Sequence, residues 1–71
     1  MYVSIFGLDP NAVARKEYCT TTVTLADGSV NVVITDVISV HSEHTRLTIN
    51  AGKDTTIYLN ISDYRFLEVE Q

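Results

Sequence analysis

Residues Thr55 to Glu70, Thr-Thr-Ile-Tyr-Leu-Asn-Ile-Ser-Asp-Tyr-Arg-Phe-Leu-Glu-Val-Glu, are the most informative part of this chain about its fold. Apolar side chains occupy every second position from Ile57 to Ile61, which predicts a strand over residues 55–61. The next two residues, Ser62-Asp63, leave room only for a tight corner, and a second strand is predicted over residues 64–70.

The last of these strands is apolar on both faces. Tyr64 and Phe66 lie on one face, and Leu67 and Val69 lie on the other. Such a strand usually has something packed on each side, and Tyr58 gives the preceding strand a similar character. No proline or row of charges protects these two strands, so we expect them to pair with a second copy of the chain. The predicted subunit interface consists of Tyr58, Tyr64, Phe66, Leu67 and Val69.

The composition upstream also favours strands. Valine, isoleucine and threonine supply 24 of the 71 residues, and their branched side chains pack well on a pleated sheet. Strands are predicted over residues 18–25, 30–40 and 45–50, with a hairpin turn at Asp27-Gly28. Asp36 interrupts the long apolar run and predicts a bulge or sharp bend within one strand.

The first quarter of the chain differs. Residues 1–8 are predicted to form an N-terminal arm or a brief strand, ended near Gly7. Asp9 is suited to cap a helix and Pro10 to occupy its first position, which predicts a short helix over residues 9–17. The alternative to association is that the arm covers the last strand within one chain.

We therefore expect one mainly β domain over residues 1–71, with a short helix followed by five strongly bent antiparallel strands over residues 18–70, as in a small barrel. A domain this small needs further stabilisation. The lone Cys19 can form no internal disulfide, and one cysteine with two histidines makes no structural zinc site. Association with other copies is the remaining source of stability.

The sequence also bears on where in the cell the protein is expected. The sequence has no apolar run of about 18 residues, the length that predicts a membrane-spanning helix. Residues 1–7 contain no lysine or arginine, so they do not read as a secretion signal. We expect a cytoplasmic protein of a bacterial cell or a phage-infected host.

Three segments resemble the Sm-like family of ring-forming small barrels: the predicted helix 10–17, the turn Leu25-Ala26-Asp27-Gly28 and the paired ending 57–69. The chain is similar in size and acidity to small phage-type members. The resemblance implies a closed homo-oligomeric ring of five to seven copies, without catalytic activity. SH3-like barrels share the five-strand pattern, so a protein-interaction module, for example a phage structural or host-modulating protein, is the alternative.

An Sm-like ring also implies single-stranded RNA as a partner. By the resemblance, the RNA-binding positions are His41, His44, Arg46 and Asn60. The chain departs from the family's motifs at Val33, in the loop from His41 to Arg46, and at Asn60-Ile61. Five basic against nine acidic side chains argue against a general phosphate-binding surface.

No catalytic motif stands out. Serine, histidine and aspartate occur, but in no recognisable nucleophile arrangement. His41 and His44 lack an evident third ligand for a metal. We therefore expect no enzyme activity, no metal and no cofactor.

Overall fold

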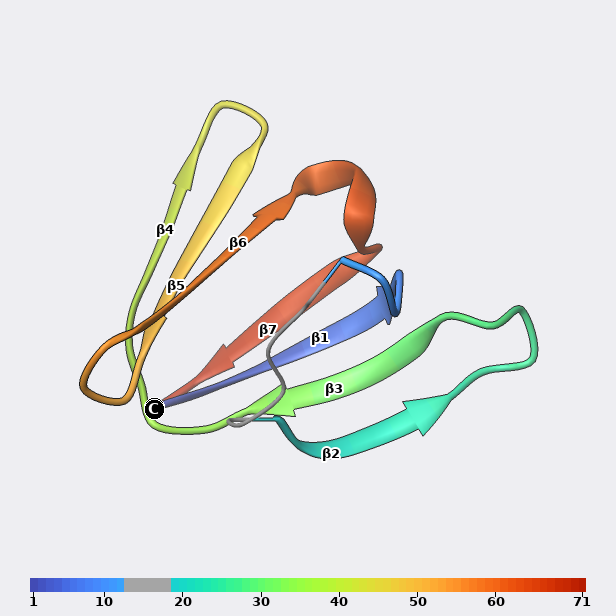
Figure 1. The fold of residues 1–71 in the computed structure, drawn as a ribbon, viewed down its shortest axis with the longest axis horizontal. Helices are drawn as coiled ribbons and strands as arrows, with labels where there is room; N and C mark the ends of the chain where they lie inside the picture. Colours follow the sequence, from blue (N-terminus) through green and yellow to red (C-terminus); the bar gives the residue numbers. More distant parts are fainter. Residues whose placement is uncertain (13–18) are drawn as a thin grey trace.

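The computed structural model describes residues 1–12 and 19–71, and these confirm the prediction of a mainly β protein. The elements are, in chain order, β1 (Tyr2–Leu8), β2 (Cys19–Thr24), β3 (Val30–Ile34), β4 (Val37–Glu43), β5 (Arg46–Ala51), β6 (Thr55–Asn60), the 3₁₀ helix η1 (Ile61–Asp63) and β7 (Phe66–Glu70). The strands form two antiparallel sheets, ordered β2-β3-β1-β7 and β4-β5-β6 (Figure 1). Among the described residues, no strand pairing closes the two sheets into a barrel.

The N-terminal segment is a central strand of its sheet, and it covers one side of the last strand within the chain, as the alternative to association expected. β1 pairs with β3 on one side and with β7 on the other. Val3 and Ile5 are completely buried, because alternate positions of β1 face the core. The sequence showed the apolar segment, but its partners in β3 and β7 lie 22 or more residues away along the chain and left no local signal.

The predicted helix over residues 9–17 is absent from its described part. Residues 10–12 form a turn and a bend, closed by a hydrogen bond from Ala12 N to Asp9 O of 3.0 Å. Asp9 Oδ1 accepts a hydrogen bond from Asn11 N, so the aspartate caps a turn where a helix was expected. A two-turn helix has little stability of its own. Residues 13–17 of that prediction lie outside the described residues.

The bend predicted at Asp36 separates β3 from β4. Asp36 has a φ of 56°, a left-handed conformation that aspartate tolerates better than most residues. Its carbonyl accepts a hydrogen bond from Gly52 N at 2.8 Å, and the next amide, Val37 N, donates to Met1 O at 3.0 Å. The long strand thereby leaves one sheet and enters the other.

The tight turns lie close to where the sequence places them. Leu25 N donates to Ser29 O across the Asp27-Gly28 turn, where Gly28 has a φ of 89°. The predicted corner at Ser62-Asp63 is the helix η1, and β7 begins at Phe66, two residues later than predicted. Asp63 Oδ2 accepts a hydrogen bond from Asn60 N at 2.8 Å and so closes that single helical turn.

The core lies between the two sheets. It is made of aliphatic side chains from β1, β3, β4, β5 and β6, and nearly all of them lie at alternate positions of their strands. Its buried members are Val3, Ile5, Leu8, Val30, Val32, Ile34, Val37, Leu47, Ile49, Ala51, Ile57 and Leu59. β7 contributes only Leu67, which is partly buried against this cluster. The last strand is therefore the least covered strand whose side chains are described throughout.

Candidate functional site

Two strand edges near the C-terminus form the candidate site. β6 ends the three-stranded sheet, and β7 ends the four-stranded sheet. The two strands follow one another through η1, from orange to red in Figure 1. No described strand pairs with the outer edge of either one. Each edge therefore presents backbone N–H and C=O groups that another strand can bind.

β6 alternates strictly between the core and the outer surface. Thr55, Ile57 and Leu59 are buried, whereas the three residues between and after them are exposed. Tyr58 is 56% exposed. The guanidinium of Arg46 lies over its ring, with Cζ 4.7 Å from the ring centroid. This contact is a cation–π interaction between neighbouring strands of one sheet.

β7 carries exposed apolar side chains on both faces. Phe66 is 52% exposed on the outer face, where its ring stacks on that of Phe6 at a centroid distance of 4.5 Å. Val69 lies opposite the buried Val3, on the core side of the sheet, and is nevertheless 44% exposed. The reason is that no described strand flanks β7 on its other side.

The five predicted interface residues fall into two groups. Tyr58, Phe66 and Val69 are exposed large apolar side chains. Tyr64 and Leu67 pack against the core and are only partly open to solvent. The inward position of Leu67 follows from its pairing with the buried Ile5, a partner that the sequence did not reveal.

Two charged residues near these edges were not part of the predicted interface. Glu68 is exposed on the outer face of β7, opposite Ser4. The sequence predicts Arg46 only as an RNA contact. In the part of the chain that the structure describes, ion pairs occur at His41–Glu43 and Arg65–Asp27, and neither involves Arg46 or Glu68. Which charged side chains pair depends on which strands are neighbours, so the sequence alone does not reveal how Arg46 and Glu68 are placed.

The predicted RNA-binding positions lie on and beside the outer face of the β4-β5-β6 sheet. Arg46 and Asn60 are direct cross-strand partners, and His41 lies one row further along, opposite Thr48. His44 is in the β4–β5 turn with a φ of 53°. His41 Nε2 lies 3.7 Å from the carboxylate of Glu43, so an acidic group accompanies the histidine. The face thus offers one arginine beside a glutamate.

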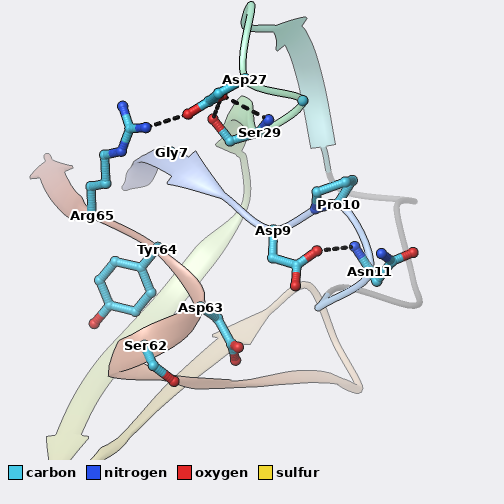
Figure 2. Close-up of a pocket in the computed structure, with 11 residues that line it drawn as sticks. Gly7, Asp9, Pro10, Asn11, Asp27, Ser29, Ser62, Asp63, Tyr64 and Arg65 are labelled. Atoms are coloured by element: carbon cyan, nitrogen blue, oxygen red, sulfur yellow. Dashed lines mark hydrogen bonds and ion pairs between the residues drawn. The ribbon is translucent and has the colours of Figure 1, made fainter.

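A hollow of about 480 Å³ lies at the opposite end of β7 from its C-terminus, between the segments 7–11, 27–29 and 62–65. Figure 2 shows Arg65 extending from the start of β7 to Asp27, with which it forms an ion pair and hydrogen bond. Asp9 N also donates a hydrogen bond to Asp63 O at 2.8 Å. These links hold together three segments that are distant in the chain. The residues of the hollow therefore have a structural role.

The carboxylate of Asp27 is the most strongly engaged group in this hollow. The hydroxyl and the backbone N–H of Ser29 donate hydrogen bonds to its Oδ1, at 2.6 and 3.0 Å. These bonds, with a smaller contribution from Arg65, hold the pKa of Asp27 below its ordinary value of 3.8. Asp27 therefore remains ionised and paired within the chain at neutral pH.

Comparison of the chain with protein-family models, with curated proteins and with solved structures gives no match. Within residues 1–12 and 19–71, no three histidine, cysteine, aspartate or glutamate side chains come together as a metal site would require. Over the same residues, no helix has the length and apolar character needed to cross a membrane. The open edges of β6 and β7 are the features from which a function can be inferred.

Proposed function

We propose that this chain is a non-catalytic assembly protein, an Sm-like small barrel whose copies join edge to edge into a closed homo-oligomeric ring. The observation that carries the proposal is the pair of open edges at β6 and β7, together with the exposed side chains of Tyr58, Phe66 and Val69. Pairing of one edge with the other covers both at once.

Neither edge is well protected against pairing. Natural proteins usually protect open edges with prolines, bulges or charged side chains. β6 contains no charged residue and no proline, and it pairs with β5 in unbroken register. Two glutamates interrupt β7, but three of its five residues are apolar. Such edges are suited to association.

A second copy of the chain is the partner that suits both edges together. β6 and β7 differ in sequence, so a contact between them is heterologous, and it uses one edge from each of two copies. Every copy then has one edge free to bind the next copy. Contacts of this kind close into rings when the rotation between neighbours permits. The Sm-like resemblance leads us to expect five to seven copies.

An SH3-like protein-interaction module is the second candidate, and one observation favours it. The strand beside β7 is β1, and residues 10–12 form a turn and a bend where a helix was predicted. This order differs from a helix followed by five strands. In such a module, β6 or β7 would accept a strand from an unrelated protein partner.

RNA binding is not part of the proposal. Nucleic-acid affinity depends mainly on cationic contacts to phosphates, and the outer face of the β4-β5-β6 sheet has Arg46 with Glu43 beside it. The net charge of −4 opposes the approach of a polyanion.

The mass of the protein in solution, measured by light scattering at micromolar concentration, tests the proposal. Five to seven copies of the 7.9 kDa chain give about 40–55 kDa, by multiplication of the chain mass. A protein that is monomeric at this concentration would overturn the proposed ring. A monomer that binds a foreign protein through β7 supports the SH3-like module in its place.

Two substitutions locate the seam. We expect Phe66→Asp and Val69→Asp each to dissociate the ring, because each puts a charge on a side chain that the contact would cover. Ile38→Asp is the matched control, since Ile38 is 65% exposed on β4, which lies at the opposite edge of the sheet from β6 and does not pair with β7. An oligomer that survives both β7 substitutions, in protein with an unchanged circular dichroism spectrum, excludes β7 as the seam.

A further inference from the structure

Arg46 and Glu68 carry complementary charges, and Glu43, the cross-strand neighbour of Arg46, forms its ion pair with His41 instead. Both are exposed, and among the described residues neither has an ion-pair partner. Arg46 extends over Tyr58 on β6, whereas Glu68 lies in the middle of β7. The two therefore lie at or beside the two edges that the proposed function brings together.

The alternation of the strands restricts how β7 of one copy can pair with β6 of the next. The core-facing positions of β6 are 55, 57 and 59, and those of β7 are 67 and 69. A sheet that continues from one copy to the next must join core-facing residues to core-facing residues. In an antiparallel arrangement, the registers that satisfy this condition differ from one another by steps of two residues.

One of these registers uses the full length of β7. It places residues 66–70 opposite residues 60–56, all within the two strands. A shift by two residues in either direction moves part of one strand beyond the end of the other. Leu67 then faces Leu59 and Val69 faces Ile57, so the half-exposed Val69 gains a buried aliphatic neighbour.

The same register brings Arg46 and Glu68 together. Glu68 comes to lie opposite Tyr58, and the guanidinium of Arg46 already lies over that ring. β5 and the neighbour's β7 are then two strand spacings apart, about 9–10 Å. An arginine that reaches across the intervening strand and a glutamate on the far strand can span this distance together.

Resting on the proposed ring, we infer that β7 of one copy pairs antiparallel with β6 of its neighbour in this register, with Arg46 binding Glu68 across the seam. The five opposed pairs are Phe66–Asn60, Leu67–Leu59, Glu68–Tyr58, Val69–Ile57 and Glu70–Thr56. The ion pair also selects the correct edges. If β7 paired antiparallel with a second β7, Glu68 would lie opposite or diagonal to another glutamate, which is destabilising.

A charge exchange tests the ion pair. We expect Arg46→Glu and Glu68→Arg each to raise the subunit dissociation constant roughly ten-fold, since each replaces an attraction with a repulsion. A chain carrying both substitutions restores the pair with reversed polarity, so its dissociation constant returns towards that of the unmodified protein. Lys53→Glu is the control for net charge, because Lys53 lies in the β5–β6 turn.

The results separate this inference from the proposed function. If the unmodified protein forms a ring and the single substitutions leave it intact, or the double substitution fails to restore it, the Arg46–Glu68 pair is wrong and the ring remains. If the unmodified protein is monomeric, both proposals are wrong.

Disulfide trapping tests the register. In a Cys19→Ser background, we expect a mixture of Thr56→Cys and Glu70→Cys proteins to form the mixed disulfide faster than a mixture of Asn60→Cys and Glu70→Cys proteins. Parallel pairing with Glu68 still opposite Tyr58 would reverse this order. Faster cross-linking of the second mixture, or none in either mixture while the ring persists, overturns the register.

Discussion

The side chain of Arg65 lies directly against the backbone of Gly7. A Cβ placed at position 7 would lie 2.6 Å from Arg65 Cδ and 2.7 Å from its Cγ, closer than real side chains approach. Gly7 also has a φ of 67°, which glycine adopts without strain. The ion pair between Arg65 and Asp27 therefore depends on having glycine, which has no side chain, at position 7 near the end of β1.

Substitution of this glycine tests the relationship. We expect Gly7→Ala to lower the free energy of unfolding by about 2–4 kcal/mol, from the positive φ and the steric overlap together. Gly28→Ala is the matched control: Gly28 has a φ of 89° but open space around its Cα, so it should cost only about 1–2 kcal/mol. Urea denaturation measures both. Equal losses of stability in the two variants would show that Arg65 does not crowd position 7. Adding Arg65→Ala to the Gly7→Ala protein should recover part of the lost free energy of unfolding.

The central position of β1 gives a second prediction. Ile5 is completely buried between β3 and β7, whereas its neighbour Ser4 faces outward. We expect Ile5→Ala to cost about 2–5 kcal/mol, enough to unfold much of so small a protein at ambient temperature. Ser4→Ala, on the opposite face, should change stability by less than about 0.5 kcal/mol. Thermal unfolding followed by circular dichroism distinguishes them. If Ile5→Ala is tolerated as well as Ser4→Ala, the segment is a loose arm.

Acid stability should depend on Asp27. Its pKa in the folded protein lies below the ordinary 3.8, so the unfolded chain binds the proton more readily. The group therefore stabilises the fold above pH 3.8, and this contribution is lost as the pH falls through the folded pKa. We expect Asp27→Asn to flatten the decline of the urea midpoint below about pH 4. Asp54→Asn, in the β5–β6 turn, is the control. A parent and Asp27→Asn protein with the same acid profile would contradict the assignment.

The outer face of the β4-β5-β6 sheet gives a prediction about RNA. With Arg46 beside Glu43 and a net charge of −4, we expect no retention of short uridine- or adenine-rich RNA at about 0.1 M salt. Fluorescence anisotropy of labelled RNA measures this. Saturable binding that weakens with salt and is lost in Arg46→Ala would restore RNA as a partner.

Several parts of the fold could be predicted because their signals are local. Alternation along residues 45–61 placed β5 and β6 to within one residue. The Asp27-Gly28 pair marked its hairpin, because a positive φ is needed there. Asp36 marked the bend, since a charged residue in an apolar run rarely continues a buried strand. The helix over residues 9–17 was a local prediction too, but a good capping residue serves a turn equally well.

The candidate site was predictable only in part. The excess of apolar residues in the last strands indicated an exposed edge, and Tyr58, Phe66 and Val69 are indeed exposed. Tyr64 and Leu67 belong to the same apolar run, yet they pack on the core. Composition alone does not tell these groups apart, because a residue's exposure depends on the strand beside it.

The amino-acid sequence is enough to predict short antiparallel strands with tight turns, and last strands that carry more apolar surface than a small fold covers. Three features depend on the tertiary structure: Tyr2–Leu8 lies between β3 and β7, Arg65 passes over Gly7, and Arg46 and Glu68 have no ion-pair partner among the described residues. The difference lies in how far apart along the chain the interacting residues are. Turns and alternation arise between residues a few positions apart, whereas strand neighbours and ion pairs join segments that are distant in the chain.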